Sequence, residues 1–496
     1  MINSLQKGEY FIRTLFKNKI IKSVIWSFLG TFISKGFVFL GMFLVARMVS
    51  VDDYGLIGLL QSFINTFTLF SLASFGVTAT KYLAKYSKTD KVKASEILSL
   101  TSLFVWSISL LVLILSIVFI NQLESFVIGR NGLYFELLVC IAAIFFASLN
   151  GLQVGALAGL ESFKKISIVN IVNGICVLPL MFFGTKYFGI LGVVVAIAIT
   201  NLSTWICSQI LLHQELKKAE IKIVFTGLFQ HKSILYNFSL PAFVSSLMIS
   251  PIILSTNVIL TKYNLNGYYH LGIYNASFYF SQIVTLLIGI VGQVFYPLAM
   301  RNFGKSNKVF DFINIVHPFA IGLFLVIPIL ILPDIFAQLF GNKYSNDDMY
   351  LTTILIGSFT IVNSLKVGIG RNFAAGNLMW YSVFSNLFWG ILVLLLSYIL
   401  VDYGAIGRAL SYFSAYLLNF LLFVPFYIRK RLVDPKLIFN KFNLFILMIL
   451  SSILFSFINL SSVFPRIIIL LLSVVLIAYI LYKWFLNYTT THGKKY

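Results

Sequence analysis

Basic side chains stand inside stretches of this sequence that are otherwise apolar enough to lie in lipid. Lys35 and Arg47 fall within TFISKGFVFLGMFLVARM, which runs from residue 31 to residue 48. A charge in the hydrocarbon region of a membrane costs several kcal/mol unless it faces water or a partner. A buried cation can instead hold an anionic group, above all a diphosphate, through charge-assisted hydrogen bonds. The sequence therefore suggests anion binding at depth in a membrane.

Further cations stand in or at the ends of apolar stretches. With Lys35 and Arg47 they are the candidate residues of a cationic substrate-binding cavity: Arg301, Lys366, Arg371 and Arg408. Lys35 is predicted near mid-membrane, because it follows the basic N-terminal segment by about 20 Å of helix. Arg47 and Arg408 are predicted at the outer end, where arginine also reaches headgroups. Lys366 and Arg371 are predicted at the inner end, where basic residues also act as anchors. A structural role stays open for each.

Acidic residues and catalytic motifs are scarce in these stretches. Glu136 lies within a predicted span and is a candidate for ion coupling or for an ion pair. The histidines and cysteines stand singly, without the spacing of a metal site, a disulfide pair or a nucleotide-binding loop. We therefore predict no catalytic residue, no metal and no cofactor, and a protein that is not an enzyme.

The composition predicts the elements that must position these residues. Hydrophobic residues make up 59% of the chain and charged residues 11%, against about 25% charged in an average soluble domain. Apolar runs of about 20 residues, each long enough to cross a bilayer as a helix, recur along the chain. The prediction is an all-α integral membrane protein with about 14 spans. They are 21–49, 54–80, 97–120, 133–160, 166–184, 189–212, 235–260, 272–300, 312–332, 350–374, 378–400, 404–428, 442–460 and 466–482.

The distribution of basic residues predicts the orientation in the membrane. With a cytoplasmic N-terminus, 29 of the 37 Lys and Arg residues fall on the inner side and five on the outer side. This bias satisfies the positive-inside rule, so both ends of the chain are predicted to be cytoplasmic. The net charge of +21 then needs no nucleic-acid partner, because anionic lipid faces the basic loops. Tyr268, Tyr269 and Tyr274 are expected in the aromatic belt at the outer interface.

An internal repeat predicts how the spans are organised. DDYGLIGLLQSF at Asp52 is echoed by HLGIYNASFYF at His270, and FGILGVVVAI at Phe188 by YGAIGRALSYF at Tyr403. In the second pair Gly189 matches Gly404. The offsets of about 215 to 218 residues cover six spans, which predicts two lobes in parallel orientation with a cavity between them. The predicted parts are an N-terminal six-helix lobe (1–212), a cytoplasmic linker (213–234), a C-terminal six-helix lobe (235–428) and a two-helix appendix (429–496).

These segments resemble a known family. The motifs ARMVS, DDYGLIGLLQ, LGIYNASF and FYPLAMRNFGK are similar to those of polysaccharide flippases in the multidrug/oligosaccharidyl-lipid/polysaccharide (MOP) exporter superfamily, and above all to Wzx-type transporters. The resemblance implies alternating access that moves an undecaprenyl-diphosphate-linked oligosaccharide from the cytoplasmic to the outer leaflet of a bacterial inner membrane. It implies a role in O-antigen, capsule or exopolysaccharide synthesis, with a polysaccharide polymerase and a chain-length regulator as partners.

Other functions stay open on the sequence alone. A cation-coupled multidrug exporter of the same superfamily would bind its cargo with buried acids, which are scarce here. A membrane polymerase or glycosyltransferase would carry catalytic groups on a long outer loop, whereas the longest predicted outer loop has about 17 residues, from Pro333 to Met349. A lipid II flippase would also bind an anionic diphosphate with basic residues, so the charges do not distinguish it from the polysaccharide flippase.

Overall fold

A computed structural model provides the structure of the chain. It describes residues 19–72, 74–224, 250–302, 308–375, 378–459 and 462–490, together with single positions and pairs between 234 and 249. The chain divides into two compact units, which we call the N-terminal unit (Met1–Leu254) and the C-terminal unit (Ser255–Tyr496). Residues 225–233 of the predicted linker 213–234 lie outside the described residues, and the predicted four-part division stays a prediction.

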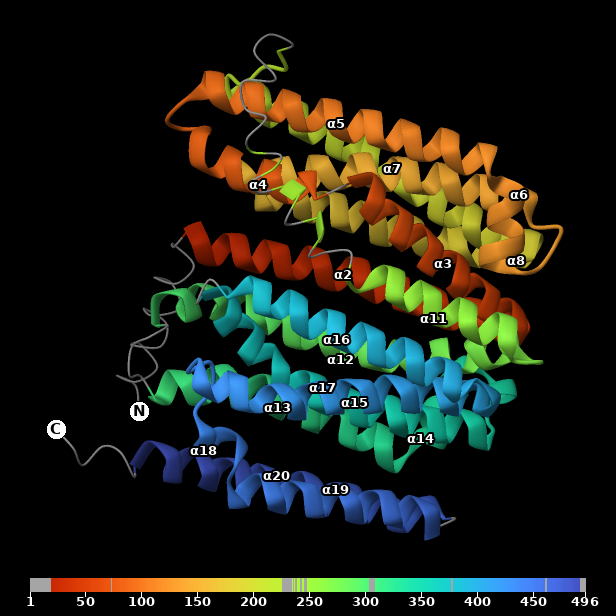
Figure 1. Cartoon of the computed structure of the whole chain (residues 1–496), viewed down its shortest axis with the longest axis vertical. Coiled ribbons are helices and arrows are strands. Elements are labelled where there is room, and N and C mark those ends of the chain that lie inside the picture. The colour runs from red at the N-terminus through yellow and green to blue at the C-terminus, as the bar shows by residue number, and fades with distance from the viewer. Residues whose placement is uncertain are drawn as a thin grey trace, which may run out of the picture. The chain divides into compact units, whose positions relative to one another are not determined.

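The described secondary structure of the N-terminal unit is helical (Figure 1). Its elements are α2 (Lys19–Met48), α3 (Val51–Leu72), α4 (Phe75–Tyr86), α5 (Lys91–Val118), α6 (Ile120–Leu123), a π-helical turn (Glu124–Ile128), α7 (Tyr134–Gly159) and α8 (Phe163–Ala219). Helix α8 packs against both α2 and α7, and α7 also packs against α4 and α3.

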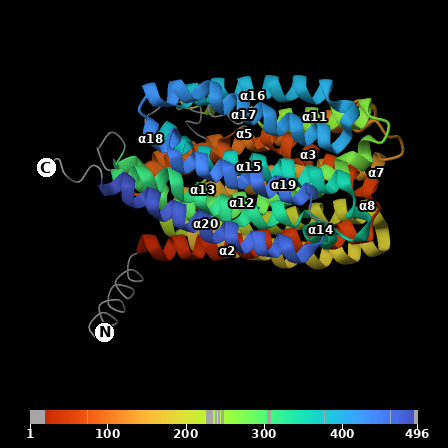
Figure 2. The same ribbon diagram turned by 90° about the horizontal axis from the view of Figure 1, so that it is seen from below.

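The C-terminal unit has the same all-helical character in its described part. Its elements are α11 (Ser250–Tyr263), which begins just before the unit boundary, α12 (Gly267–Asn302), α13 (Lys308–Ile331), α14 (Pro333–Ala337), the 3₁₀ turns η4 (Gln338–Phe340) and η5 (Asn342–Tyr344), α15 (Asp347–Ala375), α16 (Met379–Ile399), η6 (Val401–Tyr403), α17 (Gly404–Arg429), α18 (Pro435–Ile438), α19 (Lys441–Asn459) and α20 (Val463–Thr490). Helix α15 packs against α12, α13 and α17, and α17 packs against α16. These neighbours run alongside one another in Figures 1 and 2.

The helices confirm the predicted fold class. Twelve helices of the described chain are long and apolar enough to cross a membrane. One of them, α8, holds two predicted spans in its 57 residues. The predicted span 235–260 lies partly outside the described residues, and its second part forms the start of α11. The protein is therefore an all-α integral membrane protein of about 14 helices.

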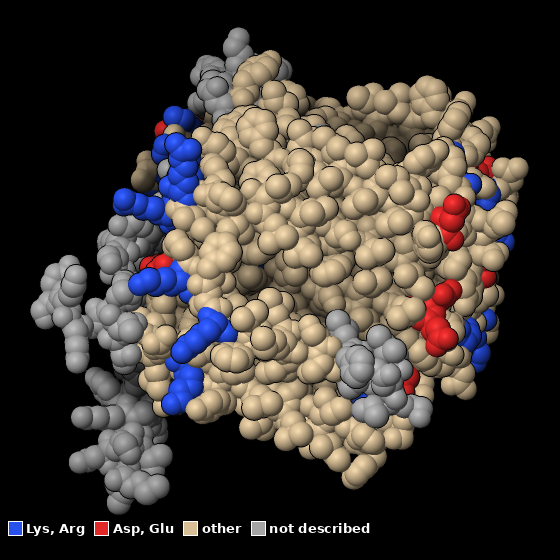
Figure 3. All heavy atoms as spheres, turned by 60° about the horizontal axis from the view of Figure 1, so that its bottom comes forward, with Lys and Arg blue, Asp and Glu red and all other residues tan. Residues whose placement is uncertain are grey.

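The apolar surface and the charges are separated along the helices. Figure 3 shows one face on which a broad apolar surface lies between a margin of Lys and Arg and a margin that carries Asp and Glu. Exposed apolar side chains such as Leu447, Leu471 and Val475 are 59%, 62% and 67% exposed. A surface of this kind is stable in contact with lipid rather than water.

The two glycines matched by the internal repeat have the same backbone conformation. Gly189, inside α8, has φ 55° and ψ −129°, and Gly404, at the start of α17, has φ 57° and ψ −129°. A positive φ of this kind strains residues that carry a Cβ atom, which accounts for glycine at both positions. The repeat in the sequence is thus also a repeat in backbone geometry.

The chain reverses direction at Gly189. A Cβ atom on Gly192 would overlap the carbonyl group of Gly184, although residues this far apart are separated by about 12 Å in a straight helix. The segments before and after Gly189 therefore form a tight hairpin, which accounts for the fifth and sixth predicted spans. The second of them continues to Ala219, beyond its predicted end at residue 212.

The predicted second span, 54–80, is two helices rather than one. Helix α3 ends at Leu72, and Ser74 has a left-handed backbone with φ 59°. The break lets α4 lie close to α7, where a Cβ atom on Gly155 would overlap the carbonyl group of Gly76. Thr80 on α4 donates a hydrogen bond of 2.8 Å to the carbonyl oxygen of Gly155. Small residues allow this close backbone approach.

Replacing Gly155 by valine is expected to lower the free energy of unfolding of the protein by about 1 to 3 kcal/mol, because α4 and α7 must move apart. The measurement is thermal unfolding of the detergent-purified protein. Gly36→Val is the matched control, since a Cβ atom at Gly36 meets nothing within 4 Å. An equal loss in both variants would contradict the close α4–α7 contact.

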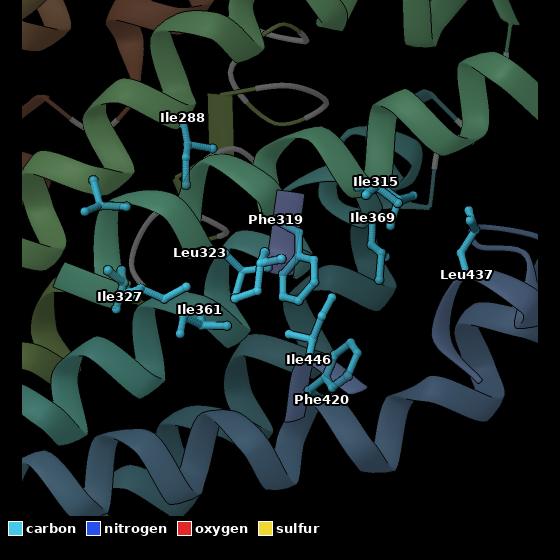
Figure 4. Packing of buried hydrophobic residues seen from close by; sticks show 14 of the residues in the cluster. Ile288, Ile315, Phe319, Leu323, Ile327, Ile361, Ile369, Phe420, Leu437 and Ile446 are labelled. Atoms are coloured by element: carbon cyan, nitrogen blue, oxygen red, sulfur yellow. The ribbon is translucent and has the colours of Figure 1, made fainter. Parts of the chain in front are cut away.

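The apolar core of the C-terminal unit surrounds α13 (Figure 4). Phe319, Leu323 and Ile327 of α13 belong to one buried cluster with Ile361 of α15 and Phe420 of α17. The cluster extends to buried residues of α19 and α20. The two C-terminal helices are therefore packed onto the rest of this unit.

Candidate functional site

A polar group stands between the middle parts of α15 and α17. Lys366 Nζ donates a hydrogen bond of 2.7 Å to Asn419 Oδ1 and lies 4.3 Å from the ring centre of Tyr416. The hydroxyl of Tyr416 donates to Asn363 Oδ1 at 2.7 Å. We call Lys366, Asn363, Tyr416 and Asn419 the Lys366 cluster.

The Lys366 cluster joins the last third of α15 to the middle of α17. The predicted position of Lys366 at the inner end of its span stays a prediction. Lys366, Asn363 and Tyr416 are half-buried, and Asn419 is buried. Amide oxygens and an aromatic face bring no negative charge to the ammonium group, so the cluster can attract an anion.

Helix α17 carries an aromatic row along the same face. Tyr412 and Tyr416, one turn apart, both pack against Phe359 of α15, with ring centres 4.8 Å and 5.0 Å away. The row ends at Arg408, whose guanidinium lies 5.6 Å from the Tyr412 ring centre. Residues four apart share one side of a helix, so α17 presents Arg408, Tyr412 and Tyr416 on one side. Lys366 of α15 lies against the Tyr416 end of this row.

Arg408 is buried where four helices meet. It is 2% exposed, and its guanidinium donates to Asn257 Oδ1 of α11 at 3.3 Å and to Ser397 Oγ of α16 at 3.4 Å. It also lies 4.8 Å from the ring centre of Tyr274 on α12. Tyr274 itself is 4% exposed, so its predicted place in an outer aromatic belt is wrong. The cation–aromatic contact holds its ring inside the unit.

Arg371 lies at a different junction from Lys366. It is 8% exposed, donates to Asn314 Oδ1 of α13 at 3.1 Å, and has room because residue 292 of α12 is glycine. A Cβ atom on Gly292 would lie 2.6 Å from the Arg371 guanidinium. Arg371 therefore stands between α12, α13 and α15, on another side of α15 from the Lys366 cluster.

Arg466 is a buried arginine with a carboxylate partner. It is 4% exposed, and its guanidinium binds both carboxylate oxygens of Asp334 at 2.9 Å and 2.8 Å. No carboxylate forms an ion pair with Lys366 or Arg408 within the described ranges. The C-terminal unit thus neutralises one internal cation and leaves two others with only uncharged partners.

Replacing Asp334 by alanine is expected to lower the free energy of unfolding by about 3 kcal/mol, because Arg466 would keep a buried charge without its counterion. Thermal unfolding of the purified protein measures the effect. Glu161→Ala is the matched control: its pair with Lys88 is exposed, so its removal is expected to cost less than about 1 kcal/mol. Similar losses in the two variants would contradict a buried structural pair.

Lys35 is on a side of α2 that does not contact α8, the helix against which α2 mainly packs. On α2, Gly30 and Ser34 face α8, where Ser34 Oγ donates to Asn173 Oδ1 at 3.0 Å. Lys35 is exposed and has no hydrogen-bond or ion-pair partner within the described residues. It shares its side of α2 with Met42, two turns further, whose sulfur accepts a hydrogen bond from Gln61 of α3. Lys35 therefore points to the α3 side of α2.

The remaining candidates are more peripheral. Arg47 is exposed near the end of α2, and Glu136 is half-exposed in the first turn of α7. Arg301 falls near the end of α12, and its side chain lies outside the described residues. The candidates thus divide into Lys35, Arg47 and Glu136 in the N-terminal unit and the others in the C-terminal unit.

The sequence analysis missed Tyr416 and Asn419 as partners of Lys366. A signal was present, because Asn363 and Lys366 are one turn apart in one predicted span, and Tyr416 and Asn419 are one turn apart in another. Polar pairs at this spacing share one side of a helix. The sequence does not show which two spans face each other.

Comparisons with known proteins indicate the family of the chain. A family model described as polysaccharide biosynthesis protein matches residues 20–303. An uncharacterized membrane protein of Methanocaldococcus jannaschii is 24% identical over 442 residues, which are 84% of this chain and 100% of that protein.

Solved structures share the fold. The lipid II flippase MurJ in an inward closed conformation has a TM-score of 0.71 at 17% identity, over 93% of this chain and 99% of that one. An inward-facing multidrug resistance MATE family transporter of the MOP superfamily has a TM-score of 0.68 at 16% identity, over 82% of this chain and 99% of that one. The fold that the resemblance implies is confirmed by these structures. Because the matched family model covers more than half of the sequence, the chain belongs to the polysaccharide biosynthesis protein family.

Proposed function

We propose that this protein is a flippase that moves a polyprenyl-diphosphate-linked oligosaccharide from the cytoplasmic to the outer leaflet by alternating access. Membership of the polysaccharide biosynthesis family supports a role in the synthesis of a surface glycan. The fold shared with transporters of the MOP superfamily supports movement of a cargo without covalent chemistry. The substrate class rests on the charge of the candidate site.

The Lys366 cluster carries this proposal. Its ammonium group is deep in the C-terminal unit, and its described partners, Asn419 and Tyr416, bring no negative charge. A diphosphate would supply that charge and accept hydrogen bonds from Lys366. The amide of Asn363 and the hydroxyl of Tyr416 are suited to sugar hydroxyls beside the phosphates. A cationic drug would be repelled by the same group.

Lys35 extends the proposal to the N-terminal unit. Its charge stands in an apolar helix without a partner in the described part of the chain, which favours contact with water or with an anionic cargo over contact with acyl chains. We assign Lys35 and Lys366 as the principal phosphate-binding residues. Arg47, Arg301 and Arg408 are secondary candidates, and Glu136 is the candidate for coupling to an ion gradient.

Transport in vesicles tests the proposed function. The purified protein is reconstituted with a fluorescent polyprenyl-diphosphate oligosaccharide, and arrival at the opposite leaflet is read with a membrane-impermeant quencher. We expect translocation of this lipid and none of a matched lipid with an uncharged linker. Efflux of a cationic dye from the same vesicles, without lipid translocation, would reject the flippase and support a multidrug exporter.

The proposal includes a cellular setting. We place the protein in a bacterial inner membrane with both termini in the cytoplasm, as the distribution of Lys and Arg predicts. An O-antigen, a capsule or another exopolysaccharide would be assembled from the exported units. A polysaccharide polymerase and a chain-length regulator would act on them at the outer surface.

A further inference from the structure

A cavity of about 360 Å³ lies between one end of α19 and the facing end of α20. Lys441, at the start of α19, and Lys483 and Asn487, on α20, line it together with the aromatic rings of Phe445 and Tyr479. The volume is within the range of about 300 to 1,000 Å³ that is typical of small-molecule sites. The cavity is in the two-helix appendix and shares no residue with the Lys366 cluster.

The cavity separates charge from apolar surface along the two helices. Lys441 and Lys483 belong to the end that the basic residues predict at the cytoplasmic surface. Phe445 and Tyr479 lie one turn further along α19 and α20, toward the middle of the membrane, and are 49% and 57% exposed. A membrane lipid has the same order, with a charged headgroup at the surface and acyl chains further in.

The charge of the cavity is uncompensated within the described part of the chain. Neither ammonium group has a carboxylate partner there, and each lies near one aromatic face, at 5.7 Å for Lys441 over Phe442 and 5.6 Å for Lys483 over Tyr479. The sequence contains no Asp or Glu after Asp434. A negative group must therefore come from outside this segment.

Helices α19 and α20, which line the cavity, are held in place by packing on the sides that face away from it. Trp484, next to Lys483, is 2% exposed; it stacks on Phe442 at 6.2 Å and meets Phe312 of α13 edge-on at 5.4 Å. Tyr488 donates a hydrogen bond of 2.9 Å to Asp434. Because α19 and α20 are held to α13 in this way, the backbone positions that carry the two lysines are fixed without a ligand, which lowers the cost of binding one.

We infer that this cavity binds the phosphate headgroup of an anionic phospholipid of the cytoplasmic leaflet. The two ammonium groups and the Asn487 amide would face the phosphate, and the acyl chains would follow the exposed rings of Phe445 and Tyr479. Basic residues near an anionic membrane surface each add binding free energy, and aromatic rings are favoured at the interface. The bound lipid is part of the membrane and is not the cargo of the proposed flippase.

Lipid retention by the full-length protein tests this site. The delipidated protein in detergent is titrated with radiolabelled phosphatidylglycerol, and the zwitterionic, net-neutral phosphatidylcholine is the competitor. We expect Lys441→Gln/Lys483→Gln to weaken retention of phosphatidylglycerol by about 25-fold, about fivefold for each lysine. Lys441→Arg/Lys483→Arg is expected to retain binding, because the charge is kept.

The matched control removes the same charge elsewhere. Lys217 and Lys222 are exposed on the side predicted as cytoplasmic, and Lys217→Gln/Lys222→Gln is expected to leave retention unchanged. Equal weakening in both double variants would overturn the site, because it would indicate a general charge effect. Displacement of the lipid by inorganic phosphate at millimolar concentration would also overturn it.

Transport assays distinguish a failure of this inference from a failure of the proposed function. Lys441 and Lys483 contact no residue of the Lys366 cluster, so Lys366→Met is expected to leave phosphatidylglycerol retention unchanged. Failure of lipid-linked oligosaccharide transport by the wild-type protein would reject the flippase and leave the lipid result standing. Loss of retention in Lys366→Met would overturn the separate site.

Discussion

Replacing Lys366 by methionine is expected to lower transport of the diphosphate-linked oligosaccharide by about 100-fold without loss of folded protein. A hydrogen bond from a charged donor contributes up to about 3 kcal/mol, which corresponds to this change. Asn419 keeps partners in the variant, because its Oδ1 also accepts from Ser385 Oγ and its Nδ2 donates to the Ser385 carbonyl oxygen. Burial of an ammonium group is costly, so the variant is expected to be as stable as the wild type or more stable.

Two measurements on the Lys366 variant distinguish function from structure. Transport in vesicles reports the role in binding, and thermal unfolding reports the role in folding. Lys343→Met, at an exposed lysine of η5, is the control and is expected to change neither. If both the stability and the transport of the variant drop, Lys366 holds α15 to α17 and does not bind cargo.

Replacing Lys35 by alanine is expected to abolish export of the glycan while the protein stays in the membrane. Lys35 faces away from α8, and the packing of α2 on α8 through Gly30 and Ser34 does not involve it. Its removal therefore takes away a charge and leaves the helix contact intact. The measurement is surface polysaccharide in cells that depend on this protein, with the membrane-inserted amount followed by immunoblot.

Lys186→Ala is the control for Lys35, because Lys186 is exposed in the same unit and is predicted at the outer surface. We expect normal export from this variant. Lys35→Arg is expected to retain export in part, since the charge remains but its geometry changes. Normal polysaccharide output from Lys35→Ala at wild-type protein level would remove Lys35 from the mechanism.

The spans were predictable because their physical cause is local. A run of about 20 apolar residues forms a helix in lipid whatever lies beside it, since every backbone polar group must be satisfied within the segment. Most helix ends therefore fall within a few residues of their predicted positions. The break at Ser74 was not predictable in this way, because it depends on the close approach of Gly76 to α7. The matched glycines at 189 and 404 were visible from the repeat.

The candidate site was only partly predictable, because contacts depend on which sides of the helices meet. The sequence identified Lys366 and Arg408 as unusual charges, but membrane-spanning helices are apolar on most sides, so their rotation is not encoded in a clear pattern. Tyr274 is an example: its type and position suggested the interface, and a cation from α17 holds it inside instead. The pairing of Asp334 with Arg466 likewise depends on the fold, since 132 residues separate them.

The hairpin at Gly189 bears on how the membrane sidedness of this protein can be mapped. Gly184 and Gly192 touch across the reversal, so these two crossings are joined without a connecting loop. An epitope inserted there would separate the two crossings. Reporter insertions should go to the segment after residue 86, where helix α4 ends and residues 88–90 are exposed.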